Sequence, residues 1–234
     1  MRNDFSDTTI ILPTLNEIGN IRKIVGMLTG RYRNVRIVIV DDGSTDGTIE
    51  AARAMGRRNR RIRLLDRSGR RLHAHTVSVV DGALLADTPK TVVMDADLQH
   101  PVEKVGELAG ALDDHDLAIG VRVVVNDWGV TRRVVSMAAG NLAALVFRLR
   151  GKPTCRDMMS GLFAIRTSVF KGMIKGNRKG FQMPGCKILL DILKMCGRDA
   201  SIVEVEYSTF HDRESGDSKL NARRMLYTLE DIFR

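Results

Sequence analysis

The chain has 234 residues, 44% of them hydrophobic and 28% charged, which is typical of a globular protein long enough to bury one main core. Its 37 lysines and arginines against 28 acidic residues give a formal net charge of +9, so phosphates, nucleic acid or an acidic membrane face are favoured partners. No run reaches the ~18–20 apolar residues of a transmembrane helix, no secretory signal is visible, and three scattered cysteines fit a reducing cytosol.

Apolar runs alternate with helical patterns through the first half of the chain. Runs rich in β-branched residues predict buried strands at residues 9–12, 36–40, 62–65 and 92–94. Apolar residues at helical spacing predict a helix after the first strand, with Asn16 as a candidate N-cap. The same spacing predicts a second helix after the second strand and a third at 74–85. This alternation predicts an α/β fold, a mostly parallel sheet with helices on both faces that binds ligands at the carboxyl ends of its strands.

The second half of the chain is less regular. We expect strands at 116–120, 162–165 and 202–205, and helices at 132–149 and 187–195. Residues 219–234 have an amphipathic pattern, with leucines and a phenylalanine opposite two arginines.

Two acidic segments follow predicted strands and are therefore expected at one edge of the sheet. The first is Asp-Asp-Gly-Ser-Thr-Asp-Gly at 41–47, and the second contains Asp95, Asp97 and Gln99. In an extended chain residues i and i+2 point the same way, so these three side chains are expected to converge. Three oxygen donors suit Mg²⁺ or Mn²⁺ with further ligands from a phosphate. A polar turn closed by Pro101 is the alternative, and residues 91–101 alone do not decide between the two.

Arginines cluster between the second and third predicted helices. They are Arg57, Arg58, Arg60, Arg61, Arg63, Arg67, Arg70 and Arg71. We interpret this run as a solvated face, with a membrane or nucleic-acid surface as the sharper alternatives. Because aromatic residues make up only 5% of the chain, stacking on nucleic-acid bases is not expected.

Five short motifs follow one another along the chain. They are Leu-Pro-Thr-Leu-Asn-Glu at 12–17, Val-Asp-Asp-Gly-Ser-Thr-Asp-Gly-Thr at 40–48, Met-Asp-Ala-Asp-Leu-Gln-His-Pro at 94–101, Asp-Met-Met-Ser-Gly-Leu at 157–162 and Phe-His-Asp-Arg-Glu-Ser-Gly-Asp-Ser-Lys-Leu at 210–220. In this order they resemble the dolichol-phosphate mannose synthase branch of family 2 glycosyltransferases. The first three fit most family 2 enzymes, whereas the last, together with the Asp-Leu-Gln-His-Pro ending, narrows the acceptor to a polyprenyl phosphate.

The resemblance implies a GT-A fold and a metal-dependent (Mg²⁺ or Mn²⁺) hexosyltransferase that inverts the sugar's anomeric configuration. The implied donor is GDP-mannose and the implied acceptor is dolichyl phosphate. The positions that match the family's nucleoside pocket are Pro13, Leu15, Glu17, Val40 and Asp42. Asp95 and Ala96 match positions beside the ribose and diphosphate, and Asp95, Asp97 and Gln99 match the metal site. Those that match the acceptor-phosphate site or the loop closing over the diphosphate are Arg122, Arg132, Ser136, Arg213 and Lys219.

The chemistry of transfer from a nucleotide sugar to a phosphate explains why acidic residues and arginines are needed together. A divalent cation neutralises the charge that grows on a departing nucleoside diphosphate. A phosphate monoester, with a second pKa around 6, is largely ionised near neutral pH and can attack an anomeric carbon without a general base. Arginine suits phosphate because its guanidinium donates two parallel hydrogen bonds. We therefore assign no catalytic base. The residues expected to be catalytic are Asp97, Arg122, Arg132, Ser136 and Arg213.

The chain departs from the family's pattern at four places. Leu15 stands where an aromatic residue is usual, and Met137 where an arginine often follows the serine. Residues 68–75 replace a glycine-rich segment before the third helix, and the spacer between Arg122 and Trp128 is short. These departures bear on the donor base, the sugar and the acceptor loop more than on the reaction class.

Several alternatives stay open. Asp42 could merely shape its turn, Asp46 could cap the next helix, and Glu17 could complement a helix dipole. The donor could be UDP-glucose or another nucleotide sugar. A different lipid or a polysaccharide as acceptor would need a base, for which Asp157 is the candidate. A basic, non-catalytic nucleic-acid-binding module is the remaining alternative, and the acidic strand ends argue against it because carboxylates repel phosphates.

A polyprenyl phosphate lies in a bilayer, so we expect a cytoplasmic protein that is peripheral at the membrane surface. It would dock through basic and amphipathic surfaces, be held by a membrane-embedded partner subunit, or continue into a hydrophobic C-terminal domain beyond residue 234. The expected division is a catalytic domain at 1–212, followed by an acceptor loop and an amphipathic helix at 213–234. That helix either faces the membrane or packs on its own domain. Nucleic acid is not an expected partner.

Overall fold

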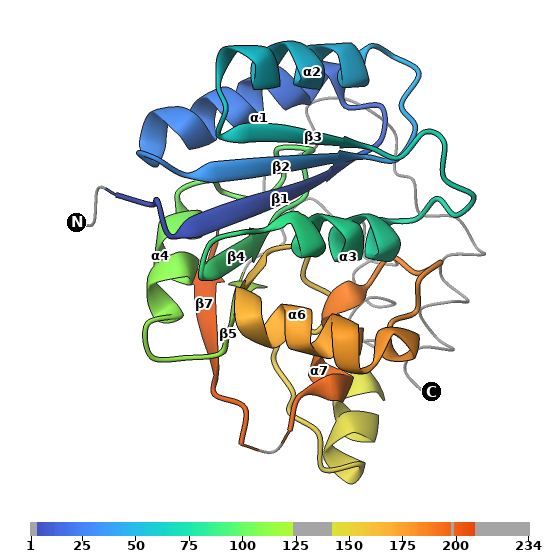
Figure 1. The fold of residues 1–234 in the computed structure, drawn as a ribbon. Helices are drawn as coiled ribbons and strands as arrows, with labels where there is room; N and C mark the ends of the chain where they lie inside the picture. The colour runs from blue at the N-terminus through green and yellow to red at the C-terminus, as the bar shows by residue number, and fades with distance from the viewer. Residues whose placement is uncertain (1–3, 124–141, 198, 209–234) are drawn as a thin grey trace.

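A seven-stranded sheet forms the centre of the protein (Figure 1). The computed structural model describes residues 4–123, 142–197 and 199–208. The strands are β1 (Thr8–Thr14), β2 (Arg36–Asp41), β3 (Ile62–Asp66), β4 (Lys90–Val93), β5 (Leu117–Arg122), β6 (Phe163–Arg166) and β7 (Ile202–Tyr207). Their order across the sheet is β3-β2-β1-β4-β6-β5-β7, and β6 runs antiparallel to both of its neighbours.

Helices cover both faces of this sheet. They are α1 (Ile18–Arg31), α2 (Thr48–Arg58), α3 (His75–Leu85), α4 (Lys104–Ala111), α6 (Thr167–Gly176) and α7 (Ile188–Met195), with a short 3₁₀ turn, η1 (Arg178–Gly180). Residues 142–149 are also helical.

Alternation along the strands divides the core into two layers. Ile10 and Leu12 of β1 pack with buried residues of α1, α2 and α4, whereas Ile11 packs with α3, α6 and α7 on the other face. Both layers contain residues that are fully buried. The central strands are therefore covered on both sides, which explains their nearly continuous apolar sequences.

The α/β fold class predicted from the alternation is confirmed, and each predicted strand overlaps an observed one. The helices α4 and α6 were not among the predicted elements. Val105, Leu108 and Ala109 of α4 do have helical spacing, but the helix has only eight residues and two of them are glycines. Of the helix expected at 132–149, the structure describes only residues from 142 onward. Residues 209–234 lie outside the described part, so the domain division near residue 212 stays a prediction.

The parallel strands β1 to β4 end at one edge of the sheet, at Thr14, Asp41, Asp66 and Val93. The loops that follow these residues carry both acidic segments to that edge, as expected from the topology. The arginine run, in contrast, is divided between the two edges. Arg57 to Arg63 precede or begin β3, and Arg67, Arg70 and Arg71 follow its end.

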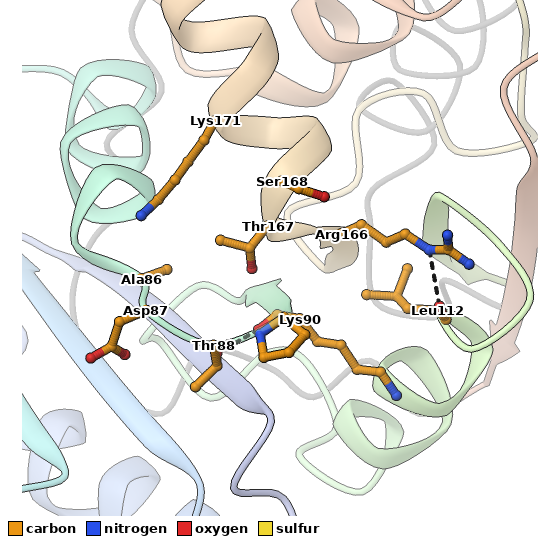
Figure 2. Close-up of a pocket in the computed structure, with 10 residues that line it drawn as sticks. Ala86, Asp87, Thr88, Lys90, Leu112, Arg166, Thr167, Ser168 and Lys171 are labelled. Atoms are coloured by element: carbon orange, nitrogen blue, oxygen red, sulfur yellow. Dashed lines mark hydrogen bonds between the residues drawn. The ribbon is translucent and has the colours of Figure 1, made fainter.

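A pocket of about 470 Å³ lies at the opposite edge, beside the beginning of β4 and of α6 (Figure 2). Arg166 donates from Nε to the carbonyl oxygen of Leu112 (3.2 Å), and Lys90 pairs with Asp113 (2.5 Å). The residues that line this pocket include none of the predicted site residues. Within the described residues, no helix combines the length and apolar character required to span a bilayer.

Candidate active site

The two neighbouring aspartates after β2 have different environments. Asp41 is fully buried and closes the turn: Oδ1 accepts from the backbone N–H groups of Gly43 (3.1 Å) and Ser44 (2.7 Å). Its Oδ2 accepts from the hydroxyls of Ser44 (2.7 Å) and Thr14 (3.0 Å). With four donors around it, Asp41 is a structural turn residue. Asp42 is the residue of this pair that is free of the turn.

Asp42 is held by a buried arginine. Arg67 is only 2% exposed and binds the Asp42 carboxylate through Nη1, while its Nε donates to Asp81 (3.0 Å). Further hydrogen bonds join Arg67 to Ser78 Oγ and to the Leu72 carbonyl oxygen, both at 3.0 Å. Burial raises the pKa of Asp42, and the charges of Arg67 and of a nearby histidine offset this only in part.

This finding corrects the interpretation of the arginine run as a solvated face at one position, Arg67. Seven of its members are exposed, but Arg67 is buried among the loops at the carboxyl edge. The signal in the sequence was its position one residue beyond the end of β3, where side chains turn toward the ligand edge of such sheets. His73 also contacts Asp42: its Nδ1 lies 3.0 Å from the carbonyl oxygen and 3.2 Å from Oδ1.

The other residues predicted for the nucleoside pocket lie beside Asp42. Pro13 and Val40 are direct partners on the adjacent parallel strands β1 and β2, and Leu15 follows the end of β1. Glu17 begins α1, where its Oε2 accepts from the Asn20 side chain (2.8 Å). The structure thus brings all five predicted positions to one edge. Their role in nucleoside binding stays a prediction.

The expected helix cap at Asn16 was wrong. The N-cap of α1 is Glu17, without a side-chain cap, and Asn16 adopts a left-handed conformation (φ 54°). Asp46 from the neighbouring loop binds the beginning of this helix instead, since its Oδ2 accepts from the backbone N–H of Ile18 (3.0 Å). Its Oδ1 accepts from the N–H of Thr48 (3.0 Å) at the beginning of α2. One carboxylate therefore ties together the beginnings of two helices that flank the site.

Asp95, beyond the end of β4, lies between two histidines. His75 Nε2, on the first residue of α3, is 3.0 Å from Oδ1, and His100 Nε2 is 3.6 Å from Oδ2. Burial alone would raise the pKa of the Asp95 carboxyl, but contacts with His100 and His75 hold it well below its usual range. The Asp95 side chain is 35% exposed, so an ionised carboxylate is accessible at this edge.

The segment after Asp95 is a turn, not an extended strand. β4 ends at Val93, Leu98 has a left-handed conformation (φ 62°), and the backbone N–H of Gln99 donates to Asp97 Oδ1 (3.2 Å). The expectation that an extended chain aligns the three side chains was therefore wrong in its geometry. Asp97 is 6% exposed and Ala96 3%.

The donor set at this turn still suits a hard divalent cation. It offers carboxylate and amide oxygens, which Mg²⁺ and Mn²⁺ prefer. In the part of the chain that the structure describes, no three His, Cys, Asp or Glu side chains come together in a way that could hold a metal ion. The protein would then supply part of the coordination, and a diphosphate would supply the remainder. Asp95, Asp97 and Gln99 as ligands stay a prediction.

Gly161 closes the far side of the Asp95 carboxylate. A Cβ at this position would lie 3.0 Å from Asp95 Cγ and 3.1 Å from His100 Nε2. The preceding Ser160 fixes this backbone, since its hydroxyl donates to the carbonyl oxygen of Gly120 (2.7 Å). The glycine of the Asp-Met-Met-Ser-Gly motif is thus required for steric reasons, because only glycine leaves room for the Asp95 carboxylate.

Arg122, at the end of β5, forms a two-hydrogen-bond ion pair with Asp157. Nε and Nη2 donate to the two carboxylate oxygens at 2.7 and 3.1 Å. Although burial alone would lower it, the pKa of Arg122 is raised by Asp157 and, to a smaller extent, by other negative groups including Asp95. Asp157, the candidate base for a hydroxyl acceptor, has both oxygens engaged by a cation.

The remaining residues expected at the acceptor side are Arg132, Ser136, Arg213 and Lys219. They lie outside the described residues.

Comparison with solved structures defines the class of protein. The glucosyl-3-phosphoglycerate synthase of Mycobacterium tuberculosis, in complex with Mn²⁺, UDP-glucose and phosphoglyceric acid, superposes with a TM-score of 0.66 over 97% of this chain and 79% of that one, at 20% identity. The fold is thus the GT-A fold of nucleotide-sugar glycosyltransferases, as expected.

Residues 9–175 match glycosyl transferase family 2, and the chain belongs to that family. The dolichol-phosphate mannosyltransferase of Pyrococcus furiosus is 33% identical over 97% of this chain, which spans 62% of that protein's length. The dolichol-phosphate mannosyltransferase of Mycosarcoma maydis is 32% identical over 96% of this chain and 77% of its own length. The resemblance noted in the motifs is confirmed.

Proposed function

We propose that the protein is an inverting glycosyltransferase that moves mannose from GDP-mannose onto a polyprenyl phosphate such as dolichyl phosphate, with Mg²⁺ or Mn²⁺. The observation that carries the proposal is that the Asp42 and Asp95 loops meet at one sheet edge in a chain similar over nearly its whole length to dolichol-phosphate mannosyltransferases. An edge with two differently held carboxylates would provide separate positions for a nucleoside and for a metal-bound diphosphate.

On the donor side, Pro13, Leu15, Val40 and Asp42 would surround the base and ribose. Asp42, held in place by Arg67, would accept hydrogen bonds from the nucleoside, since its pairing leaves little net charge to attract a cation. Leu15 offers apolar contact to the base rather than the aromatic stacking usual in the family.

At the diphosphate, Asp95, Asp97 and Gln99 would hold the divalent cation. When bound, the cation supplies Lewis-acid neutralisation of the departing diphosphate. The similar fold of the M. tuberculosis enzyme binds Mn²⁺ together with UDP-glucose, which supports a divalent cation here without choosing between the two metals. His75 and His100 lie on either side of the Asp95 carboxylate.

On the acceptor side, Arg122 would meet the acceptor phosphate, with Arg132, Ser136, Arg213 and Lys219 completing the site. The ionised phosphate needs no general base. Asp157 would orient Arg122 rather than take a proton, because Arg122 engages both of its oxygens. This pairing disfavours the alternative of a hydroxyl acceptor deprotonated by Asp157.

The acceptor would bring the protein to the cytoplasmic membrane face. The site edge must then face the bilayer, which places Arg57 to Arg63 on the opposite edge, away from the lipid. Docking would depend on residues near the site, on a membrane-embedded partner subunit, or on a hydrophobic domain beyond residue 234.

A transfer assay tests the proposal. Radiolabelled GDP-mannose, and separately UDP-glucose, is incubated with dolichyl phosphate in detergent and Mn²⁺, with Asp97→Ala as the inactive control. We expect a lipid-extractable product from GDP-mannose that is lost with EDTA and in the variant. Product from UDP-glucose alone would mean that the donor is UDP-glucose and not GDP-mannose. Retained metal-dependent nucleotide binding without product from either donor would refute the acceptor.

A further inference from the structure

His75 contributes a side chain to the Asp95 loop from a distant element. It is the first residue of α3, and its Nε2 approaches Asp95 Oδ1 at 3.0 Å across a sequence separation of 20 residues.

The two ring nitrogens of His75 have different surroundings. Its Nδ1 is buried and has no hydrogen-bond partner among the described residues. Nε2 is the ring nitrogen that faces Asp95, at 3.0 Å from Oδ1. A proton on Nε2 makes His75 a hydrogen-bond donor that orients this carboxylate.

The opposite oxygen of Asp95 is bounded by other segments. His100 Nε2 lies 3.6 Å from Oδ2, and His100 Nδ1 is 2.9 Å from the hydroxyl of Tyr207 on β7. Gly161 leaves the space that the carboxylate occupies. Rotation of Asp95 about its side-chain bonds is thus restricted on both sides, and His75 is the restraint on Oδ1.

We propose that His75 is a positioning residue for the divalent cation: it holds Asp95 in a fixed orientation from which the carboxylate binds the metal–diphosphate. This inference rests on the proposed function, since it assumes that Asp95 is a metal ligand. His75 acts through Asp95, because its Nε2 lies 3.0 Å from Asp95 Oδ1. Outer hydrogen-bond partners of this kind typically change metal affinity 10–100-fold when removed.

The test is a calorimetric titration of Mn²⁺ into the protein with saturating GDP, repeated with UDP. The variants are His75→Ala, which removes the donor, and His75→Gln, whose amide nitrogen can replace Nε2. His115→Gln is the matched control, since the His115 ring lies away from Asp95, with its Nδ1 3.1 Å from the Ala111 carbonyl oxygen of its own turn. Thermal unfolding without metal shows whether each variant folds normally.

We expect His75→Ala to weaken Mn²⁺ binding about tenfold or more, His75→Gln to restore most of the affinity, and His115→Gln to match the parent. Equal Mn²⁺ affinity in His75→Ala and the parent would overturn the inference and leave the proposed function intact. A glutamine variant as weak as the alanine variant, with both folded, would also overturn it. If the parent itself bound no Mn²⁺ with either nucleotide, the proposed function would fail with it.

Discussion

The two acidic loops at the carboxyl edge differ in what holds their carboxylates. Asp42 is paired with the buried guanidinium of Arg67, so the pair carries little net charge. Asp95 is held between the imidazoles of His75 and His100. An aspartate follows each of these two parallel strands, and it lies beside an arginine in one loop and beside two histidines in the other.

This difference suggests that the two loops bind different parts of the nucleotide sugar. A carboxylate already paired with arginine remains a hydrogen-bond acceptor but attracts a metal ion only weakly. A carboxylate without an arginine partner is more available to a divalent cation. We therefore expect the Asp42 loop to contact the nucleoside and the Asp95 loop to contact a metal-bound diphosphate. The predictions below test this division.

Removing the Arg67 guanidinium beside Asp42 should have the largest effect on stability. Arg67→Met leaves a carboxylate that is 9% exposed without its partner, and we expect a loss of about 3–5 kcal/mol in the free energy of unfolding. Urea denaturation measures this loss. Arg70→Met, at an exposed arginine of the same run, should change stability by less than about 0.5 kcal/mol. Similar values for the two variants would contradict the burial of Arg67.

Adding a methyl group beside Asp95 should have the next largest effect. In Gly161→Ala the new Cβ would lie 3.0 Å from Asp95 Cγ, so the carboxylate must move, at a cost of about 1–3 kcal/mol and with weaker Mn²⁺ binding. Gly172→Ala is the control, because no heavy atom lies within 4 Å of its Cβ position in α6. That substitution should stabilise the protein by up to about 1 kcal/mol. Unchanged stability and Mn²⁺ binding in Gly161→Ala would show that metal binding does not depend on the present position of Asp95.

The hydroxyl of Tyr207 should matter less. Tyr207→Phe removes the hydrogen bond to His100 Nδ1 (2.9 Å), and we expect a loss of about 1 kcal/mol in unfolding free energy. Mn²⁺ binding should weaken only slightly, because His75 still holds the other oxygen of Asp95. A loss of metal binding as large as that of His75→Ala would mean that His100, not His75, is the main restraint.

The smallest effects should appear in the pH dependence of stability, with opposite signs for the two loops. The pKa of Asp95 is lowered in the folded protein, so its contribution to stability is present above the usual value of 3.8 and is lost as the pH falls below it. The pKa of Asp42 is raised, so the folded state favours its protonated form and stability declines as the pH rises above 3.8.

Asp95→Asn and Asp42→Asn, compared with the parent by urea denaturation over a pH series, measure these contributions. The stability advantage of the parent over Asp95→Asn should shrink in acid, and its advantage over Asp42→Asn should shrink as the pH rises. Slopes of the same sign would contradict the proposed difference between the loops.

The sequence predicted the fold class and the sheet edge that carries the acidic loops, because both follow from apolar runs and the ends of parallel strands. It did not predict the partners of the acids. Arg67 was hidden in a run whose other members are solvated, and His75 reaches Asp95 only because α3 begins beside the end of β4. The Arg122–Asp157 pair joins residues 35 positions apart. Such contacts depend on tertiary packing, which local patterns do not encode.

The most direct measurement of the division between the loops is Mn²⁺ and GDP binding by the parent, Asp95→Asn and Asp42→Asn. Both substitutions keep the shape of the side chain and remove its charge. We predict that Asp95→Asn loses Mn²⁺ binding, whereas Asp42→Asn still binds Mn²⁺ and has a lower affinity for the nucleotide. Undiminished Mn²⁺ binding by Asp95→Asn, or loss of Mn²⁺ binding in Asp42→Asn alone, would contradict the account.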